Sequence, residues 1–285
     1  MIFEALSKPE YLWRPSQAFR RLVFEPQDSL EVLRLPWGPG ILARSSETIG
    51  RAIATQGVYD LPVTEAIFRL LDPGETALDV GANIGYMSFV LARATGPGGK
   101  VLAFEPNSQV LVCLRKNLST WSSLRVAPIE LMSIALSDRA GTASMILPSD
   151  FKDNEGTAKL GFGPGEVAVT VARLDEIQKS PVGLMKVDVE GHEGAVFEGG
   201  EQLLRDKQIR DIVFEEHDSF PARSHQILQG HGYCIYLLTR STFRPLLLPA
   251  QTSSRLRFLP TNYLATANPK RAEARMKGWG WSCLS

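Results

Sequence analysis

The feature that most constrains the fold of this 285-residue chain is a short apolar strand that runs directly into a glycine turn. Thr76–Val80 is typical of a buried strand, Gly81 to Gly85 forms the turn, and a helix is expected over about Tyr86–Ala94. A second strand, Val101–Phe104, then ends at the acid Glu105. A strand, a glycine loop, a helix and a second strand ending in an acid are typical of the nucleoside-binding half of a doubly wound sheet.

The spacing within the loop limits which nucleoside fits. Dinucleotide-binding loops carry three glycines, which let a pyrophosphate approach the start of the helix. Here the pattern is Asp79-x-Gly81-x-x-x-Gly85, with Asn83 between the glycines, so the central glycine is missing. The Glu105 carboxylate suits a ribose diol, because it can accept two hydroxyl hydrogen bonds. S-adenosylmethionine has a ribose, no phosphate and an amino-acid tail, so we predict this cofactor. A plain strand-to-helix turn without a ligand is the alternative.

Composition agrees with a soluble enzyme, which we expect in the cytoplasm. Lys plus Arg and Asp plus Glu both number 31, which argues against a general nucleic-acid or anionic-membrane surface. The three cysteines are widely separated and show no metal or disulfide spacing, so a reducing compartment is expected. We see no signal-peptide core at the start and no run of about 18 apolar residues that would span a membrane. The composition leaves the oligomeric state open.

The middle of the chain alternates strand-like and helix-like segments and predicts an α/β fold. We expect a doubly wound, mostly parallel seven-stranded sheet, preceded by a helical and irregular N-terminal extension. An inserted strand pair is expected at Ala143–Leu147 and Glu166–Val171. The sheet strands are expected at Thr76–Val80, Val101–Phe104, about Arg125–Glu130, Gly183–Val187, Asp211–Phe214, Tyr233–Thr239 and Leu256–Leu259.

Ligands of such sheets bind outside the carboxyl ends of the strands, and this rule selects the candidate site. Most of the polar residues of the sheet region follow strand ends and should therefore meet at one rim. The segments concerned are Asp79–Gly85, Glu105–Asn107, Ser133–Ala135, Asp188–His192 and Glu215–Asp218.

The segment Met185–Glu193 is unusually charged for the end of a central strand. Lys186 alternates with apolar neighbours, and a buried lysine is costly unless it is paired. It could form an ion pair with Asp188 or Glu190 that only fixes the turn. We favour a polar wall beside the cofactor, because perturbed charges gather at active sites.

These motifs, in this order, resemble the signature of the FkbM family of S-adenosylmethionine-dependent methyltransferases. The resemblance covers about residues 60–265. It rests on Leu78–Gly85, Phe104–Pro106, Ala135–Asp138, Leu174–Glu176 and Lys186–Glu193. It implies a class I methyltransferase fold and O-methylation of a small molecule, typically a sugar or a secondary metabolite. We accordingly expect residues 1–60 to cap the acceptor, residues 61–268 to form the methyltransferase domain, and residues 269–285 to form a C-terminal tail.

Each strand end is assigned a role in holding the cofactor. Asp188 should face the sulfonium, whose positive charge it would offset. The methionine end is assigned to Asp79, Gly81, Ala82, Asn83 and Gly85, the ribose to Glu105 with Pro106, and the adenine side to Asn107, Ser133 and Ala135.

Methyl transfer needs alignment of the reacting atoms, and an alcohol acceptor also has to lose a proton. Of the candidate bases, we prefer His217, because an unperturbed histidine titrates near pH ~6.5. Asp188, Glu216 and His192 are the others. A divalent metal on Asp188, Glu215 and Glu216 is possible in principle but not favoured, because the spacing of these ligands is not distinctive.

The acceptor is the least constrained feature. N-methylation of a peptide or amine is an alternative to O-methylation, and an NAD-dependent oxidoreductase is a weaker one. Four aromatic residues, Trp13, Trp37, Tyr59 and Phe162, are candidate acceptor contacts, although such residues more often belong to the core.

Overall fold

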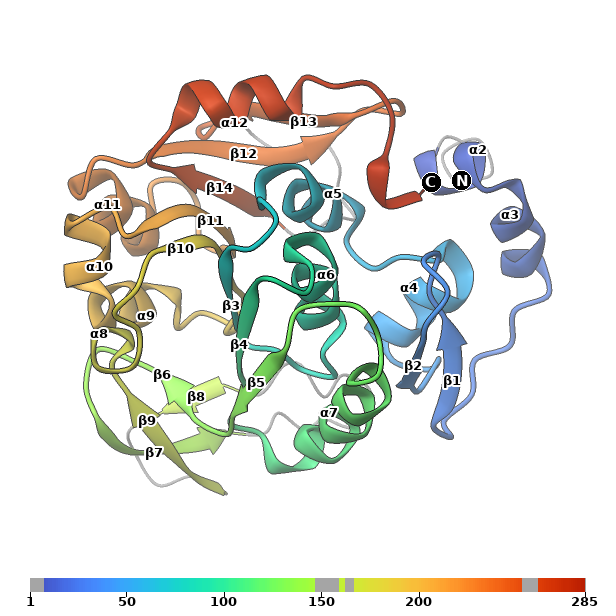
Figure 1. Ribbon diagram of the computed structural model, residues 1–285, viewed down its shortest axis with the longest axis horizontal. Coiled ribbons are helices and arrows are strands. Elements are labelled where there is room, and N and C mark those ends of the chain that lie inside the picture. Colours follow the sequence, from blue (N-terminus) through green and yellow to red (C-terminus); the bar gives the residue numbers. More distant parts are fainter. Residues whose placement is uncertain (1–7, 147–158, 162–166, 253–260, 285) are drawn as a thin grey trace.

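A mixed eight-stranded sheet forms the centre of the molecule (Figure 1). The computed structural model describes residues 8–146, 159–161, 167–252 and 261–284. The strand order is β13-β12-β14-β11-β10-β3-β4-β5, and the five strands from β11 to β5 are parallel. Their bounds are β3 Thr76–Val80, β4 Lys100–Phe104, β5 Ile129–Met132, β10 Val182–Val187, β11 Ile209–Glu215, β12 Cys234–Arg240, β13 Pro245–Pro249 and β14 Asn262–Thr266.

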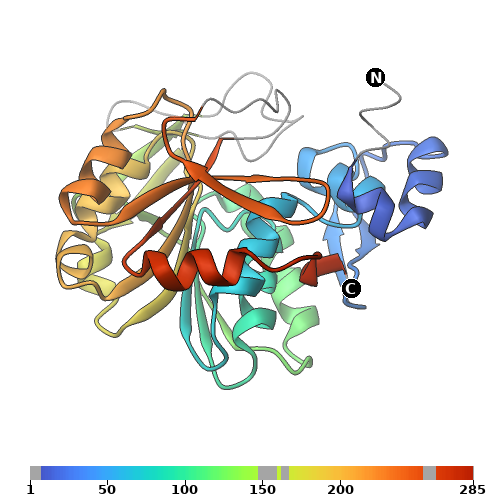
Figure 2. The ribbon, with the colours of Figure 1, turned by 90° about the horizontal axis from the view of Figure 1, so that it is seen from above.

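Helices cover both faces of this sheet, as a doubly wound fold requires (Figure 1 and Figure 2). Alternate residues of each strand point to opposite faces. One face packs with α5 (Leu61–Leu70), α6 (Tyr86–Thr95), α7 (Ser108–Trp121) and α12 (Pro269–Met276). The other packs with α8 (Leu174–Ile177), α9 (Glu193–Gly199), α10 (Glu201–Arg205) and α11 (Arg223–Gly230).

The predicted α/β class and the order of the elements are confirmed, but the strand count is wrong by one. The chain turns back after β12, and β13 pairs with it as an antiparallel edge strand. The expected strand at Leu256–Leu259 lies outside the described residues, and β14 follows them at Asn262–Thr266. Two short helices follow β10, because the chain breaks between α9 and α10 at Gly200.

The inserted strand pair belongs to a second, smaller sheet of order β6-β9-β7-β8. Its strands β7 and β9 are antiparallel and lie close to the predicted positions. The bounds are β6 Ala135–Leu136, β7 Gly141–Ile146, β8 Lys159–Gly161 and β9 Val167–Ala172. Because β6 belongs to this sheet, the chain leaves the main sheet directly after β5.

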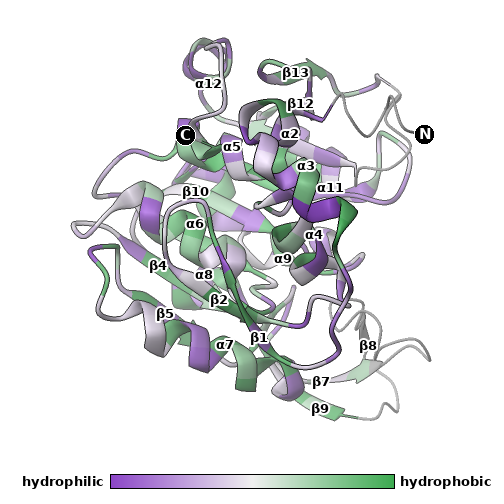
Figure 3. Ribbon diagram, turned by 90° about the vertical axis from the view of Figure 1, so that its right-hand side faces the viewer, coloured by the Kyte–Doolittle hydropathy of each residue, from purple (hydrophilic) through white to green (hydrophobic). Residues whose placement is uncertain are grey.

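The N-terminal extension contains helices, as its sequence predicts, and also a hairpin. The hairpin pairs β1 (Glu31–Arg34) with β2 (Gly40–Ala43) around Trp37. Helices α2 (Pro9–Trp13) and α3 (Pro15–Leu22) precede it, and α4 (Thr48–Gln56) follows it. Strand β2 lies against α7, along which hydrophilic and hydrophobic residues alternate (Figure 3). The extension is thereby joined to the sheet domain.

The C-terminal tail fastens this extension to the core. The Glu65 carboxylate on α5 accepts hydrogen bonds from the backbone N–H groups of Ser282 and Cys283, at 3.0 and 2.9 Å. The Trp37 indole donates to the Cys283 carbonyl oxygen at 3.0 Å, and Trp281 is buried. The tail therefore bridges α5 and the N-terminal hairpin. No helix among the described residues has both the length and the apolar character to cross a bilayer.

We predict that Glu65→Ala lowers the free energy of unfolding by about 3–5 kcal/mol, because it removes the carboxylate paired at 2.6 Å with the buried Arg69 guanidinium and the acceptor of the Ser282 and Cys283 N–H groups. Urea denaturation measures this change. The control is Glu130→Ala, since the Glu130–Lys100 ion pair is more than half exposed on the glutamate side and should contribute about 0–1 kcal/mol. Equal stabilities of the two variants would contradict the bridging role of the tail.

Candidate active site

The glycine loop between β3 and α6 is shaped by residues in the left-handed region. Gly81 has φ +80°, and a Cβ atom there would lie 1.9 Å from the carbonyl oxygen of Asp188. Gly85 has φ +92°, and a Cβ there would meet Leu114 at 2.6 Å. Asn83 also has positive φ, and its side-chain oxygen accepts from the N–H of Ile84 at 2.7 Å. The loop needs glycine at both positions because neighbouring chain segments pack directly against it.

Glu105 at the end of β4 joins this loop to the start of α7. Its carboxylate accepts one hydrogen bond from the N–H of Asn83 at 2.8 Å and another from the N–H of Asn107 at 2.9 Å. Burial raises the pKa of Glu105 to about 7, although both backbone donors act in the opposite direction. Each carboxylate oxygen still has a lone pair available, so the group can also accept hydroxyl hydrogen bonds.

Lys186 connects the loop to the end of β10. It lies beside Asp79 in the register of β3 and β10, so both side chains point to the same face of the sheet. Its ammonium donates to the Gly81 carbonyl oxygen at 3.0 Å and lies 3.4 Å from Asp188. Burial alone would lower the pKa of Lys186, but the carboxylates of Asp188 and Asp79 outweigh it and raise the pKa. The charged lysine thus holds both the glycine loop, through Gly81, and the end of β10, through Asp188.

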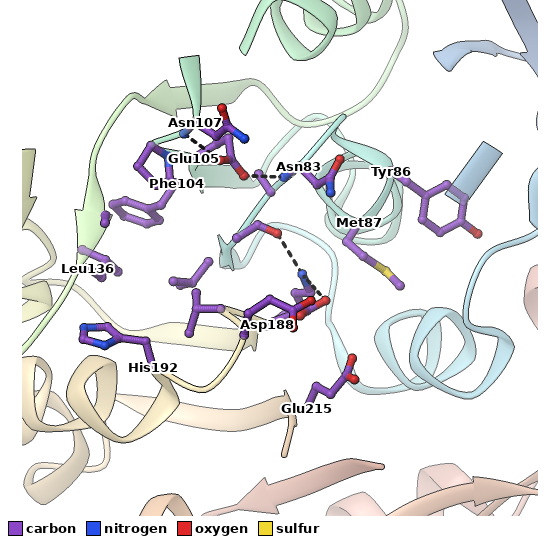
Figure 4. Close-up of a pocket in the computed structure, with 18 of the residues that line it drawn as sticks. Asn83, Tyr86, Met87, Phe104, Glu105, Asn107, Leu136, Asp188, His192 and Glu215 are labelled. Carbon is purple, nitrogen blue, oxygen red and sulfur yellow. Dashed lines mark hydrogen bonds and ion pairs between the residues drawn. The ribbon is translucent and has the colours of Figure 1, made fainter. Parts of the chain in front are cut away.

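A pocket of about 370 Å³ opens at this rim of the sheet (Figure 4). The ends of β3, β4 and β10 meet there, together with α4, α6 and the segment before β6. It is lined by Thr48, Ile49, Tyr59, Val80, Gly81, Ala82, Asn83, Tyr86, Met87, Phe104, Glu105, Pro106, Asn107, Ile134, Ala135, Leu136, Met145, Lys186, Asp188, Val189, Glu190, His192, Glu215 and His217.

Most residues selected from the sequence line this pocket, and four do not. The first group comprises Gly81, Ala82, Asn83, Glu105, Pro106, Asn107, Ala135, Asp188, His192 and His217. Asp79 is fully buried, and its carboxylate accepts a hydrogen bond from the Ser88 hydroxyl at 2.5 Å. Gly85 packs against α7, and the Ser133 hydroxyl accepts from Arg115 at 2.9 Å. Glu216 is turned toward Ser224 and the N–H of Asp218. None of these four residues lines the pocket.

One end of the pocket is apolar and the other is acidic. Phe104 and Leu136 lie at the apolar end, on the same side as His192 (Figure 4). The His192 ring lies 2.9 Å from the buried Ser137 hydroxyl, and burial lowers the pKa of this histidine. A planar, uncharged ring would fit at this end.

The acidic end is formed at the tips of β10 and β11. Asp188, Glu190 and Glu215 line it, and Figure 4 shows Asp188 and Glu215 directed into the same open region. His217 is about half exposed, and its Nε2 atom lies 3.5 Å from Glu190 and 3.6 Å from Glu215. Among the described residues, no group of three or more His, Cys, Asp or Glu side chains is arranged to hold a metal ion.

Several pocket residues were missed by the sequence analysis. Thr48 and Ile49 come from α4 of the N-terminal extension, and Tyr86 and Met87 from the first turn of α6. No chemical motif marks these residues, because their position depends on long-range packing. Tyr59 lines the pocket, whereas Trp37 packs against Phe68 and Phe89. Trp13 is not among the lining residues, and Phe162 lies outside the described residues.

Comparison with known proteins identifies the family. A family model described as the Methyltransferase FkbM domain matches residues 79–235. The chain belongs to the FkbM methyltransferase family. The matched segment of this FkbM-family protein contains the glycine loop, Glu105 and the whole Lys186–Glu193 segment. Family membership makes the chain an S-adenosylmethionine-dependent methyltransferase and overturns the weaker alternative of an NAD-dependent oxidoreductase.

The chain is also similar to individual known proteins. The 31-O-demethyl-FK506 methyltransferase FkbM of Streptomyces tacrolimicus is 31% identical over 246 residues, which span 73% of this chain and 90% of that protein. The protein-L-isoaspartate O-methyltransferase of Aeropyrum pernix is 32% identical over 120 residues, or 41% of this chain and 38% of that protein. The crystal structure of methyltransferase FkbM from Methylobacillus flagellatus KT has a TM-score of 0.46 and 16% identity, and the match covers 69% of this chain and 44% of that one.

Gly81→Ala is expected to weaken cofactor binding and to destabilise the protein, because its Cβ would clash with the Asp188 carbonyl oxygen. Gly38→Ala is the control: Gly38 has φ +99° with nothing within 4 Å of the methyl group that alanine would add, so only the left-handed penalty of about 1–2 kcal/mol applies. Overpacking should cost Gly81→Ala a further ~1–3 kcal/mol. Chemical denaturation and calorimetric titration of S-adenosylmethionine measure both effects. Normal affinity in Gly81→Ala would contradict the loop assignment.

Proposed function

We propose that this FkbM-family enzyme transfers the methyl group of S-adenosylmethionine to a hydroxyl group of a small molecule, such as a sugar or a secondary metabolite. The observation that carries the proposal is the pocket itself, in which Glu105 and the Gly81 loop lie at one wall and an acidic region faces them. The relative from Streptomyces tacrolimicus is named a 31-O-demethyl-FK506 methyltransferase, which supports oxygen as the acceptor atom.

The residues of the pocket fit the proposed cofactor. The Glu105 carboxylate would accept the ribose hydroxyls, and the peptide groups of Gly81, Ala82 and Asn83 would hold the amino-acid end. The apolar end with Phe104 and Leu136 would enclose the adenine, beside Asn107 and Ala135. Asp188, held by Lys186, would lie on the sulfonium side. When bound, S-adenosylmethionine supplies a methyl group already activated by the positive sulfur.

The remaining part of the pocket is proposed to take the acceptor. Thr48, Ile49 and Tyr59 belong to the N-terminal extension, which supports its role as an acceptor cap over the methyltransferase domain of residues 61–268. Holding the acceptor in line with the methyl group can contribute about 7–11 kcal/mol, and a placed base about 10²- to 10⁴-fold in rate. His217, the base favoured by the sequence, lies at this side of the pocket.

A reducing compartment, and thus the cytoplasm, is proposed for the protein. All three cysteines are free, and Cys113 and Cys283 are buried singly in the core. Nothing in their arrangement requires oxidation for folding.

Glu105→Ala should weaken S-adenosylmethionine binding by about 1.5–3 kcal/mol, the contribution of hydrogen bonds to a charged group. Isothermal titration calorimetry measures the change, and circular dichroism checks that the variant is folded. Glu130→Ala, an exposed substitution on β5, should bind the cofactor as the wild type does. A folded Glu105→Ala protein with unchanged affinity would remove the ribose assignment.

The acceptor class is tested by incubating the enzyme and S-adenosylmethionine with a panel of sugars, macrolide alcohols, phenols, amines and peptides. Mass spectrometry should show the gain of one methylene unit on a hydroxylated compound, and fragmentation should place it on oxygen. Methylation only of amines or peptides would replace O-methylation by the alternative N-methylation.

A further inference from the structure

We propose that Glu215 is the catalytic residue that accepts the proton of the acceptor hydroxyl, and that His217 carries this proton to solvent. The assignment rests on the proposed methyl transfer and concerns a residue that the sequence analysis considered only as a metal ligand. It stands on the position of Glu215, on its lack of hydrogen-bond donors among the described residues and on the charges around it.

Glu215 is placed where an acceptor would meet the methyl donor. It ends β11, the strand next to β10, and its side chain lines the pocket on the same side as Asp188 (Figure 4). The cofactor-binding elements proposed above, Glu105 and the Gly81 loop, belong to β4 and β3, on the other side of β10. A group bound between Asp188 and Glu215 would therefore lie beside the sulfonium end and away from the ribose.

Unlike Glu105, Glu193 and Glu216, the Glu215 carboxylate accepts no hydrogen bond from the described protein groups. Glu105 accepts two backbone hydrogen bonds, and Glu193 accepts two at 3.2 Å from Val189 and Gly191. Glu216 accepts from Asp218 and Ser224. Within the described part of the chain, the nearest partner of Glu215 is the His217 ring at 3.6 Å, beyond hydrogen-bond distance. Its oxygens are thus available to a bound hydroxyl.

The surroundings of Glu215 make it a proton acceptor suited to neutral pH. Burial raises its pKa to about 8, and the negative charges of Asp188, Asp60 and Glu190 add to the shift. Lys186 opposes the shift but does not cancel it. The neighbouring phenol of Tyr59, with its pKa raised by burial, stays protonated. A base whose pKa is near the working pH transfers protons most efficiently.

The other candidate bases are engaged elsewhere. Asp188 is paired with Lys186, Glu216 is turned away from the pocket, and His192 contacts Ser137 at the apolar end. The Nε2 atom of His217 faces Glu190 and Glu215, while the ring is 54% exposed. His217 is therefore better placed between Glu215 and solvent than between the acceptor and the methyl group.

The proposed step conserves atoms and charge. The acceptor O–H bond breaks and its proton passes to a carboxylate oxygen of Glu215. The electron pair left on oxygen forms the new O–C bond, while the C–S bond breaks and its electrons stay on sulfur. The products are the methyl ether, S-adenosylhomocysteine and protonated Glu215, which returns its proton to solvent through His217.

The test compares Glu215→Gln, His217→Asn and Glu190→Gln, assayed with the most rapidly methylated hydroxyl compound of the panel described above. Glu215→Gln should lower kcat about 10²- to 10⁴-fold with unchanged S-adenosylmethionine affinity, whereas His217→Asn should lower it less than about tenfold. The wild-type rate should rise with pH, reach half of its maximum near pH 8 and level off above that, following ionisation of Glu215. Glu190→Gln removes one like charge and should move this rise to lower pH. Glu130→Gln is the unaffected control.

Thermal unfolding provides a second readout that needs no acceptor. The pKa of Glu215 is higher in the folded protein than the ordinary glutamate value of 4.5, so the folded state binds its proton more tightly than the unfolded chain does. The associated stability is present at low pH and is lost as the pH rises toward 8. Glu215→Gln escapes this loss, so its Tm advantage over the wild type should grow between about pH 5 and pH 8.

Each outcome decides the assignment. Near-wild-type turnover in Glu215→Gln, a larger loss in His217→Asn than in Glu215→Gln, or a pH-independent Tm difference would each overturn the role of Glu215 while leaving the proposed methyl transfer intact. Failure of the wild type to bind S-adenosylmethionine would instead overturn the proposed function, and the base assignment with it.

Discussion

The buried ammonium of Lys186 is the interaction on which the site depends. It donates to the Gly81 carbonyl oxygen and lies within 3.6 Å of the Asp79 carboxylate and 3.4 Å of the Asp188 carboxylate. Two neighbouring strands, the glycine loop and the start of the acidic wall are therefore held by one charge. A buried charge is tolerated only when it is paired, so these groups must stay together in the folded protein. Their pairing fixes the position of the pocket residues around Lys186.

The two ends of the pocket use carboxylates in opposite ways. Glu105 is fixed by two backbone donors and so presents its remaining lone pairs in a set direction. Glu215 accepts no hydrogen bond from the described protein groups and is surrounded by like charges. The first arrangement suits recognition of a ribose, and the second suits transient uptake of a proton. The self-repulsion of the acidic end costs stability, as expected where function and folding compete.

The sequence was sufficient for the parts of the fold that depend on local chemistry. Strand β3 has the predicted bounds, and the Gly81 loop, Glu105 and Asp188 line the pocket as expected, because each follows directly from the end of a parallel strand. The pocket residues of α4 and the edge strand β13 depend on long-range packing and carry no local signal.

The sequence also could not decide which individual side chains at the strand ends point into the pocket. Ser133 points toward Arg115 because the chain turns from β5 to the second sheet just after it. Glu215 and Glu216 have identical side chains, yet consecutive residues along an extended chain face opposite ways, so only Glu215 reaches the pocket.

The central claim is that the nucleoside lies over Gly81 and Glu105. A crystal structure with S-adenosylhomocysteine tests it most directly: the account predicts ribose hydroxyls on the Glu105 carboxylate and the amino-acid end at the glycine loop, and a nucleoside bound elsewhere would contradict it.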